Sequence, residues 1–177
     1  MKKFLLFIWE IVKIAIIALI IVVPVRAFIF QPFFVRGASM EPNFHDFDYL
    51  IVDEISYRFS EPQRGDVIVF YNPNNHSQRF IKRIIGLPGE TIRISEGSIS
   101  IQKDNGEFFI LDETDYLDEG VRTLNNREMF LEQEEYFVMG DNRALSLDSR
   151  TFGALQRDLI IGKESFRLWP WKILAKD

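Results

Sequence analysis

The sequence predicts a mainly β fold, an antiparallel β sandwich or barrel that follows a single N-terminal transmembrane helix. Two observations predict it. The first 26 or so residues are apolar enough for a membrane helix, whereas the rest of the chain consists of short runs of β-branched and aromatic residues separated by turn signals. No long amphipathic helical pattern follows the N-terminal segment. The remaining residues, about 150, are enough for one domain with its own core.

The N-terminal segment has the composition of a retained membrane anchor. Between residues 4 and 25 the only charged side chains are Glu10 and Lys13, whose i, i+3 spacing allows them to pair on one helix face. About 20 apolar residues are enough to span the ~30 Å hydrocarbon core of a bilayer. A cleavable signal peptide is the alternative, because two lysines precede the apolar run, but the end of the run offers no A-x-A cleavage site. We therefore expect a retained single-pass anchor.

Five runs in the remainder of the chain predict strands, because each is rich in β-branched or aromatic residues and is bounded by turn residues. They are Tyr49–Val52, Val67–Tyr71, Ile92–Ile94, Ile99–Ile101 and Glu135–Met139. The Asp-Asn-Gly turn at residues 104–106 predicts a β-hairpin that joins the fourth run to Phe108–Leu111. The apolar stretch 27–35 predicts a strand that lies either against the membrane surface or in the core.

Two regions therefore organise the chain. Residues 1–26 form the N-terminal tip and the anchor, and residues 27–177 form the β domain. Within that domain, residues 104–135 are acidic and irregular, and we interpret them as an insertion of variable length. No strong strand pattern marks Glu119–Glu134, which could form a short helix.

The charges are unevenly distributed. The first 26 residues carry a net charge of +3, which leaves −8 for the remainder of a chain whose formal net charge is −5. An acidic globular part argues against binding to nucleic acid, which requires a basic face. The chain has no cysteine, so disulfides, zinc–thiolate sites and a cysteine nucleophile are excluded, and two histidines are too few for a histidine metal cluster. We expect neither a metal nor a cofactor.

Ser39 and Lys82 are the candidate catalytic pair. Ser39 lies shortly after the apolar segment, in the motif at residues 37–42, and a serine hydroxyl needs a base to become a nucleophile. His45 is close in sequence, but we interpret it as a turn residue. Lys82 is flanked by isoleucines that could exclude water and lower the amine pKa from about 10.4 toward the working pH. On local sequence alone, a salt-bridged surface residue is the favoured interpretation of Lys82.

A third motif, residues 140–150, is dense in charged and polar side chains and follows a predicted strand. Such density is typical of a mutually paired network that orients a site, although an ordinary polar loop is the alternative.

These motifs occur in a fixed order behind the anchor. The motifs are Ser39-Met40-Glu41-Pro42, Arg64-Gly65-Asp66-Val67-Ile68-Val69-Phe70, Lys82-Arg83-Ile84-Ile85-Gly86-Leu87-Pro88-Gly89 and Gly140-Asp141-Asn142-Arg143 with Ser146 and Asp148-Ser149-Arg150. Together they resemble the bacterial type I signal peptidases (leader peptidases) of the short, Gram-positive-like form. The closing stretch 166–170 is similar to the C-terminal strand of that family.

The resemblance implies specific roles at the site. Ser39 would be the nucleophile, Lys82 the general base, and Ser146 would hydrogen-bond to the lysine and orient it. Four charged residues would brace the surrounding loop: Asp141, Arg143, Asp148 and Arg150.

The resemblance also implies how the substrate is held. The backbone N–H of Ser39 would stabilise the oxyanion, and the position of a second donor in some members is occupied here by Gly37, which has no hydroxyl. Four residues would line the shallow pockets for small side chains at −1 and −3: Phe33, Val35, Met40 and Ile81.

Three positions depart from the family pattern. Asn43-Phe44 replaces the usual Thr-Leu, Glu90 stands where Asp is commoner, and Ala144-Leu145 replaces a more polar pair. None of these changes removes a catalytic group, but Asn43 and Leu145 could alter rate or substrate preference.

The resemblance implies a membrane-bound serine endopeptidase that cleaves signal peptides from secretory preproteins after small residues at −1 and −3. The N-terminus would be cytoplasmic and the catalytic domain extracytoplasmic at the cell membrane. Its partners would be signal peptides, membrane lipid and the translocation machinery. Two other protein classes are the alternatives to this function. One is a self-cleaving Ser-Lys regulator, which would need a DNA-binding module, and the other is a catalytically silent membrane β-domain.

Overall fold

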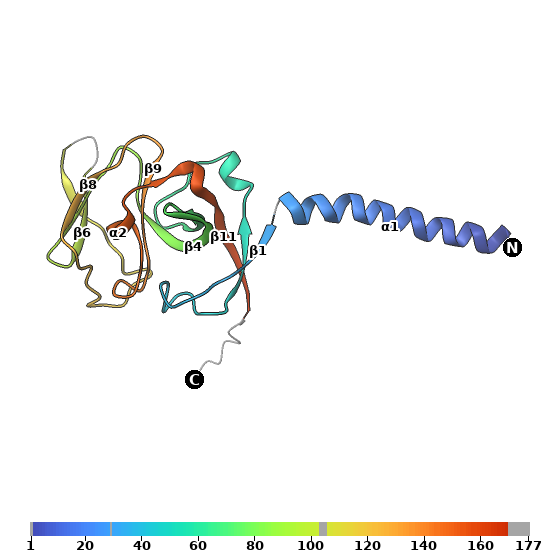
Figure 1. Ribbon diagram of the computed structural model, residues 1–177, viewed down its shortest axis with the longest axis horizontal. Helices are drawn as coiled ribbons and strands as arrows, with labels where there is room; N and C mark the ends of the chain where they lie inside the picture. Colours follow the sequence, from blue (N-terminus) through green and yellow to red (C-terminus); the bar gives the residue numbers. More distant parts are fainter. Residues whose placement is uncertain (1, 29, 103–105, 170–177) are drawn as a thin grey trace.

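Two antiparallel sheets form the β domain, and helix α1 (Lys2–Phe28) projects away from them (Figure 1). The computed structural model describes residues 2–28, 30–102 and 106–169. The larger sheet has seven strands, in the order β1 (Phe30–Phe34), β2 (Tyr49–Asp53), β11 (Ile160–Trp169), β3 (Val67–Asn72), β4 (Asn75–Gly86), β9 (Glu135–Met139) and β10 (Leu155–Gln156). The smaller has four, in the order β7 (Phe108–Ile110), β6 (Ser98–Gln102), β5 (Thr91–Ser95) and β8 (Arg127–Phe130). The short helices are η1 (Ser56–Arg58), α2 (Ser149–Phe152) and η2 (Arg157–Leu159).

The mainly β prediction is confirmed, and all five predicted strands are present. Strands β6 and β7 pair as the predicted hairpin, with Ile101 opposite Phe109, while turn residues 103–105 lie outside the described residues. The apolar stretch 27–35 contributes strand β1, which pairs with β2 at the edge of the larger sheet. The short helix considered for Glu119–Glu134 is wrong: this stretch contains strand β8, which pairs with β5.

Helix α1 is largely apolar and exposed. Phe4 is 67% and Trp9 59% exposed, and Glu10 accepts a hydrogen bond of 2.7 Å from Lys13, as the i, i+3 spacing predicts. Within the part of the chain that the structure describes, no helix combines the length and the apolar character needed to cross a membrane. The transmembrane role of this segment stays a prediction.

The centre of the larger sheet is buried on both faces. Along β3, Val67 and Val69 belong to one apolar cluster, whereas Ile68 and Phe70 belong to a second cluster on the opposite face. Successive side chains of a strand point to opposite faces, so a strand covered on both sides reads as a continuous apolar run. A third cluster lies around Phe137 and joins the larger sheet to the smaller one. The strands that carry the candidate site are therefore held rigidly in the middle of the fold.

Candidate active site

Ser39 lies in a tight turn after β1 that is anchored from two sides. The side chain of the next residue, Met40, is completely buried and packs in the first apolar cluster. On the other side, the backbone N–H of Asn142 donates to the Ser39 carbonyl at 3.1 Å, and the Asn142 side-chain amide donates to the Ala38 carbonyl at 3.0 Å. The turn is thereby attached to the loop at residues 140–150.

Lys82 comes from β4 and reaches Ser39 directly. Its Nζ donates hydrogen bonds of 2.7 Å to the Ser39 Oγ and of 2.7 Å to the Ile81 carbonyl. The Lys82 side chain is buried, since the residue is only 3% exposed. The alternative of a salt-bridged surface lysine is therefore wrong. A nucleophile and a base within hydrogen-bond distance is the arrangement that nucleophilic catalysis requires.

Burial lowers the pKa of Lys82 to about 8, because the charged ammonium loses its hydration in the protein interior. The carboxylates of Asp148 and Asp141 oppose this shift by stabilising the charged form. The two effects leave an amine that is substantially neutral in mildly alkaline solution and can accept the proton of Ser39.

Ser146 lies beside this pair but does not bond to it. Its Oγ is buried and has no hydrogen-bond partner among the described residues, so the bond to Lys82 that the resemblance implies is not formed in this structure. Gly140 explains the close packing here: a Cβ at this position would collide with the Ser146 Oγ and the Ser39 carbonyl oxygen. Glycine at 140 thus allows three parts of the site to lie in contact.

Asp148 and Arg150 hold the far end of the loop. The Asp148 carboxylate accepts two hydrogen bonds from the Arg150 guanidinium, at 2.9 and 2.8 Å, and a third from the Gly140 N–H at 3.1 Å. Burial would raise the pKa of Asp148, but the bonds from Arg150, with a smaller contribution from the Gly140 N–H, hold that pKa below its ordinary value. The carboxylate therefore stays charged and continues to act on Lys82.

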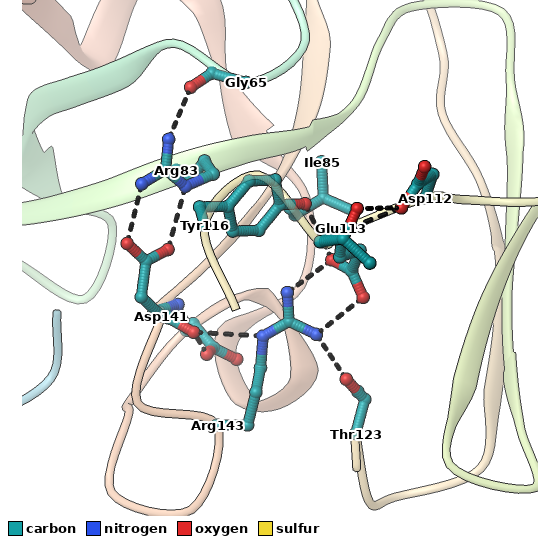
Figure 2. Close-up of polar contacts among 12 residues, drawn as sticks. Gly65, Arg83, Ile85, Asp112, Glu113, Tyr116, Thr123, Asp141 and Arg143 are labelled. Atoms are coloured by element: carbon teal, nitrogen blue, oxygen red, sulfur yellow. Dashed lines mark hydrogen bonds and ion pairs between the residues drawn. The ribbon is translucent and has the colours of Figure 1, made fainter. Parts of the chain in front are cut away.

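Asp141 is held by Arg83, the residue that follows Lys82 on β4. Figure 2 shows the two-pronged contact, in which Arg83 Nε and Nη2 donate to Asp141 at 2.8 and 2.7 Å. The Asn43 amide also donates to Asp141, at 2.9 Å. Because neighbouring residues of a strand point to opposite faces, the side chain of Arg83 points away from that of Lys82 and binds the loop through Asp141. Asn43, one of the departures from the family pattern, is thus part of the network.

Arg143 binds residues of the predicted insertion. Its guanidinium donates to both carboxylate oxygens of Glu113, at 3.1 Å for the Nη1 bond, and to the Thr123 hydroxyl (Figure 2). Its Nε donates to the Gly140 carbonyl at 3.1 Å. Sequence reasoning missed Glu113 and Thr123, because nothing in an acidic, irregular stretch distinguishes a buried partner from a solvated side chain.

A groove of about 560 Å³ opens beside Ser39 and Lys82. Of the four predicted pocket residues, Phe33 and Ile81 line it, whereas Val35 and Met40 are fully buried in the core beneath it. Leu145, an exposed departure from the family pattern, also lines the groove, together with Leu147. The groove is therefore walled mainly by apolar side chains.

Two backbone N–H groups near the nucleophile, those of Gly37 and Ser39, differ in whether they are occupied. The Gly37 N–H is occupied, since it donates to Asp46 Oδ1 at 2.9 Å, and Gly37 adopts a positive φ of 87° that favours glycine. The Ser39 N–H donates to no other described residue. Within the described ranges, no cluster of His, Asp or Glu is arranged to hold a metal ion.

The family model and the relatives that match this chain carry the same description, signal peptidase. The family model described as "Signal peptidase, peptidase S26" matches residues 8–169. "Signal peptidase I" of Bacillus licheniformis is 32% identical over 99% of this chain and 95% of its own length. "Probable signal peptidase I-2" of Synechocystis sp. is 35% identical over 91% of this chain and 73% of its own length.

A solved structure of a signal peptidase I from Enterococcus faecalis V583 is 31% identical to this chain and covers 60% of it and 98% of the solved chain. Its TM-score is 0.48, so the likeness to known proteins rests on the sequences.

Proposed function

This chain belongs to the family described as "Signal peptidase, peptidase S26", whose members are serine peptidases, and we propose that it cleaves signal peptides with a Ser39–Lys82 dyad. The observation that carries the proposal is the 2.7 Å contact between the Ser39 Oγ and a buried Lys82 Nζ. A buried lysine that approaches neutrality has the properties of a general base.

In the proposed reaction, neutral Lys82 removes the proton of the Ser39 hydroxyl while Oγ attacks the carbonyl carbon of the scissile bond. The resulting ammonium then gives this proton to the leaving amine of the mature protein. The signal peptide stays bound to Oγ as an acyl group until Lys82, neutral again, activates a water molecule that hydrolyses the ester.

The Ser39 N–H is the proposed oxyanion donor, because it is unoccupied and belongs to the residue that attacks. Removal of one such donor typically costs about 10²–10³ in kcat, so a single N–H is a substantial contribution. Gly37 offers no hydroxyl, and its own N–H is held by Asp46.

For Ser146 we propose a role that begins once Lys82 is protonated. A buried hydroxyl without a partner costs about 1–3 kcal/mol. A hydrogen bond with the new ammonium would satisfy the Ser146 Oγ and orient Lys82 toward the leaving amine. Asp141, Arg143, Asp148 and Arg150 would keep the loop that carries Ser146 in place.

The proposed substrate is the end of a signal peptide, with small residues at −1 and −3. The support is the apolar lining of the groove beside Ser39, and Phe33 and Ile81, which line it, are the residues proposed to limit the size of the substrate side chains.

We further propose that residues 1–26 anchor the enzyme in the cell membrane, with the N-terminus cytoplasmic and residues 27–177 as the extracytoplasmic domain. The support is the apolar sequence of α1, its many exposed apolar side chains, and the short distance in sequence from Arg26 to Ser39. Membrane lipid and the translocation machinery are the corresponding proposed partners. A nucleophile close to the bilayer would meet a signal peptide where its apolar segment ends.

The test uses detergent-solubilised full-length protein and a preprotein with alanine at −1 and −3. The wild type is expected to release the mature protein, with the cleavage site identified by mass spectrometry, whereas Ser39→Ala and Lys82→Ala are each expected to abolish release. Cleavage that survives in Lys82→Ala would overturn the mechanism, and an intact preprotein after incubation with wild type would overturn the function.

A further inference from the structure

Residues 112–123, here called the brace segment, connect the smaller sheet to the catalytic loop. Both ends of the segment are tied to the smaller sheet and the turn that joins its strands. The Leu111 N–H donates to the Ile99 carbonyl at 2.9 Å, and the Thr123 N–H donates to the Gly97 carbonyl at 2.9 Å. Between these two points the segment leaves the sheet and contacts the loop at residues 140–143. These two hydrogen bonds fix the ends of the brace segment to the smaller sheet and its turn.

Glu113 forms the first arm of the brace. Its carboxylate accepts hydrogen bonds from both Arg143 Nη atoms; the Arg143 side chain is buried, 2% exposed, and the Glu113 side chain is largely covered, 14% exposed. The Tyr116 hydroxyl donates to the same carboxylate at 2.8 Å. Charged pairs with two parallel hydrogen bonds are the strongest and most directional of their kind. The position of Glu113 therefore determines the position of the Arg143 guanidinium.

Arg143 passes this constraint to the nucleophile. Its Nε donates to the Gly140 carbonyl at 3.1 Å. Gly140 in turn has no free space, because a Cβ there would meet both the Ser39 carbonyl oxygen and the Ser146 side chain. A displacement of Gly140 would therefore be transmitted to Ser39 and Ser146.

Tyr116 forms the second arm. Its ring lies 4.2 Å from the Arg83 guanidinium carbon, and its carbonyl accepts a 2.6 Å hydrogen bond from the Asn43 amide (Figure 2 shows the ring beside Arg83). Arg83 and Asn43 both bind Asp141. The two arms of the brace thus converge on adjacent parts of the same loop.

We propose that the brace segment positions the catalytic loop, and that Glu113 is a positioning residue that acts through Arg143 and Gly140 to hold Ser39 against Lys82. This inference rests on the proposed function. Glu113 contacts no reacting atom, so its contribution is geometric. Misplacement of reacting groups by about 1 Å can cost about 10²-fold in rate, so a small shift of the loop is enough to be measured.

The test compares Glu113→Ala and Glu113→Gln with wild type in preprotein cleavage. The matched control is Glu119→Gln, an exposed carboxylate of the same segment. We expect Glu113→Ala to lower kcat at least tenfold and Glu113→Gln at least threefold, with KM changed less than twofold and the control unchanged. Circular dichroism melting selects an assay temperature at which each variant is folded, so a loss of kcat there does not arise from unfolding.

A double-mutant cycle identifies the route of the effect. If Glu113 acts through Arg143, then Glu113→Ala is expected to lower kcat little further in an Arg143→Ala background. Full additivity would overturn the route through Arg143. If Glu113→Ala does not fold, the decision rests on Glu113→Gln, which keeps the shape of the side chain.

The outcomes for the two proposals are distinguishable. Wild type that cleaves while both Glu113 variants retain kcat within twofold would overturn the positioning role and leave the proposed function intact. Wild type that cleaves no preprotein would overturn both.

Discussion

Raising the pH is the perturbation that tests the central chemical claim, that a neutral Lys82 is the base. Burial holds the pKa of Lys82 at about 8, against an ordinary value of 10.5. Only the neutral amine accepts the proton of Ser39, so activity is expected to rise with pH through the pKa of this residue and to level off above it. An active carboxylate base would give the same rise several pH units lower.

The magnitude follows from the titration of one group. An amine with a pKa near 8 is about 1% neutral at pH 6, about 10% at pH 7 and about 90% at pH 9. We therefore expect kcat/KM to rise roughly 100-fold between pH 6 and pH 9. At its ordinary pKa, Lys82 would be about 0.03% neutral at pH 7, so burial supplies a gain of roughly 300-fold at that pH.

The assay measures initial rates of preprotein cleavage from pH 6 to pH 10, with a substrate that carries no titrating side chain near the cleavage site. A control variant, Lys163→Gln, replaces a lysine of β11 that strand β3 separates from Lys82, and it is expected to keep the same profile. A flat profile, or an activity that is already maximal at pH 6, would refute the assignment of Lys82 as the base.

Two further predictions concern the cost of building this site. Lys82→Met removes a buried amine whose lowered pKa opposes folding. The free-energy cost of burying the charged amine is fully present below pH 8 and is relieved as the pH rises toward 10.5. The variant is therefore expected to be inactive yet more stable to unfolding by up to about 3 kcal/mol at pH 7. Thermal melting at pH 7 and pH 10 measures this, and a stability gain that does not shrink at pH 10 would contradict it. Gly140→Ala places a methyl group against Ser39 and Ser146, so we expect a loss of about 1–3 kcal/mol in unfolding free energy and a large loss of kcat. Denaturant unfolding and cleavage rates measure these effects, and wild-type activity in this variant would show that the contact is not tight.

The strands were predictable because their signals are local. Val67–Tyr71 reads as one continuous apolar run, and the structure explains why: β3 lies between two apolar clusters and is buried on both faces. The failure at Glu119–Glu134 has the opposite cause. Strand β8 within it is short, half exposed along its length, and exists because it pairs with β5, a partner that no local pattern specifies.

The network at the site was predictable only in part. The motif at residues 140–150 indicated a paired network, but not which residues complete the pairs. Arg83 pairs with Asp141 because it follows Lys82 on a strand and points to the other face. Glu113 and Tyr116 come from an acidic stretch that, in the sequence, resembles a solvated insertion.

The order of amino acids specifies the chemistry that is available: a serine, a lysine among isoleucines, a dense polar loop, and their order behind an apolar segment. It left open whether Lys82 was a base or a surface cation, because a pKa depends on hydration and on charges that are distant in sequence. The tertiary structure decided this by burying β4 in the larger sheet, which removes water from Lys82 and places its amine 2.7 Å from Ser39. The tertiary structure also shows that the brace segment, which has no motif of its own, contacts the catalytic loop. The ion pair between Glu113 and Arg143 joins side chains that are distant in sequence, so only folding brings them together.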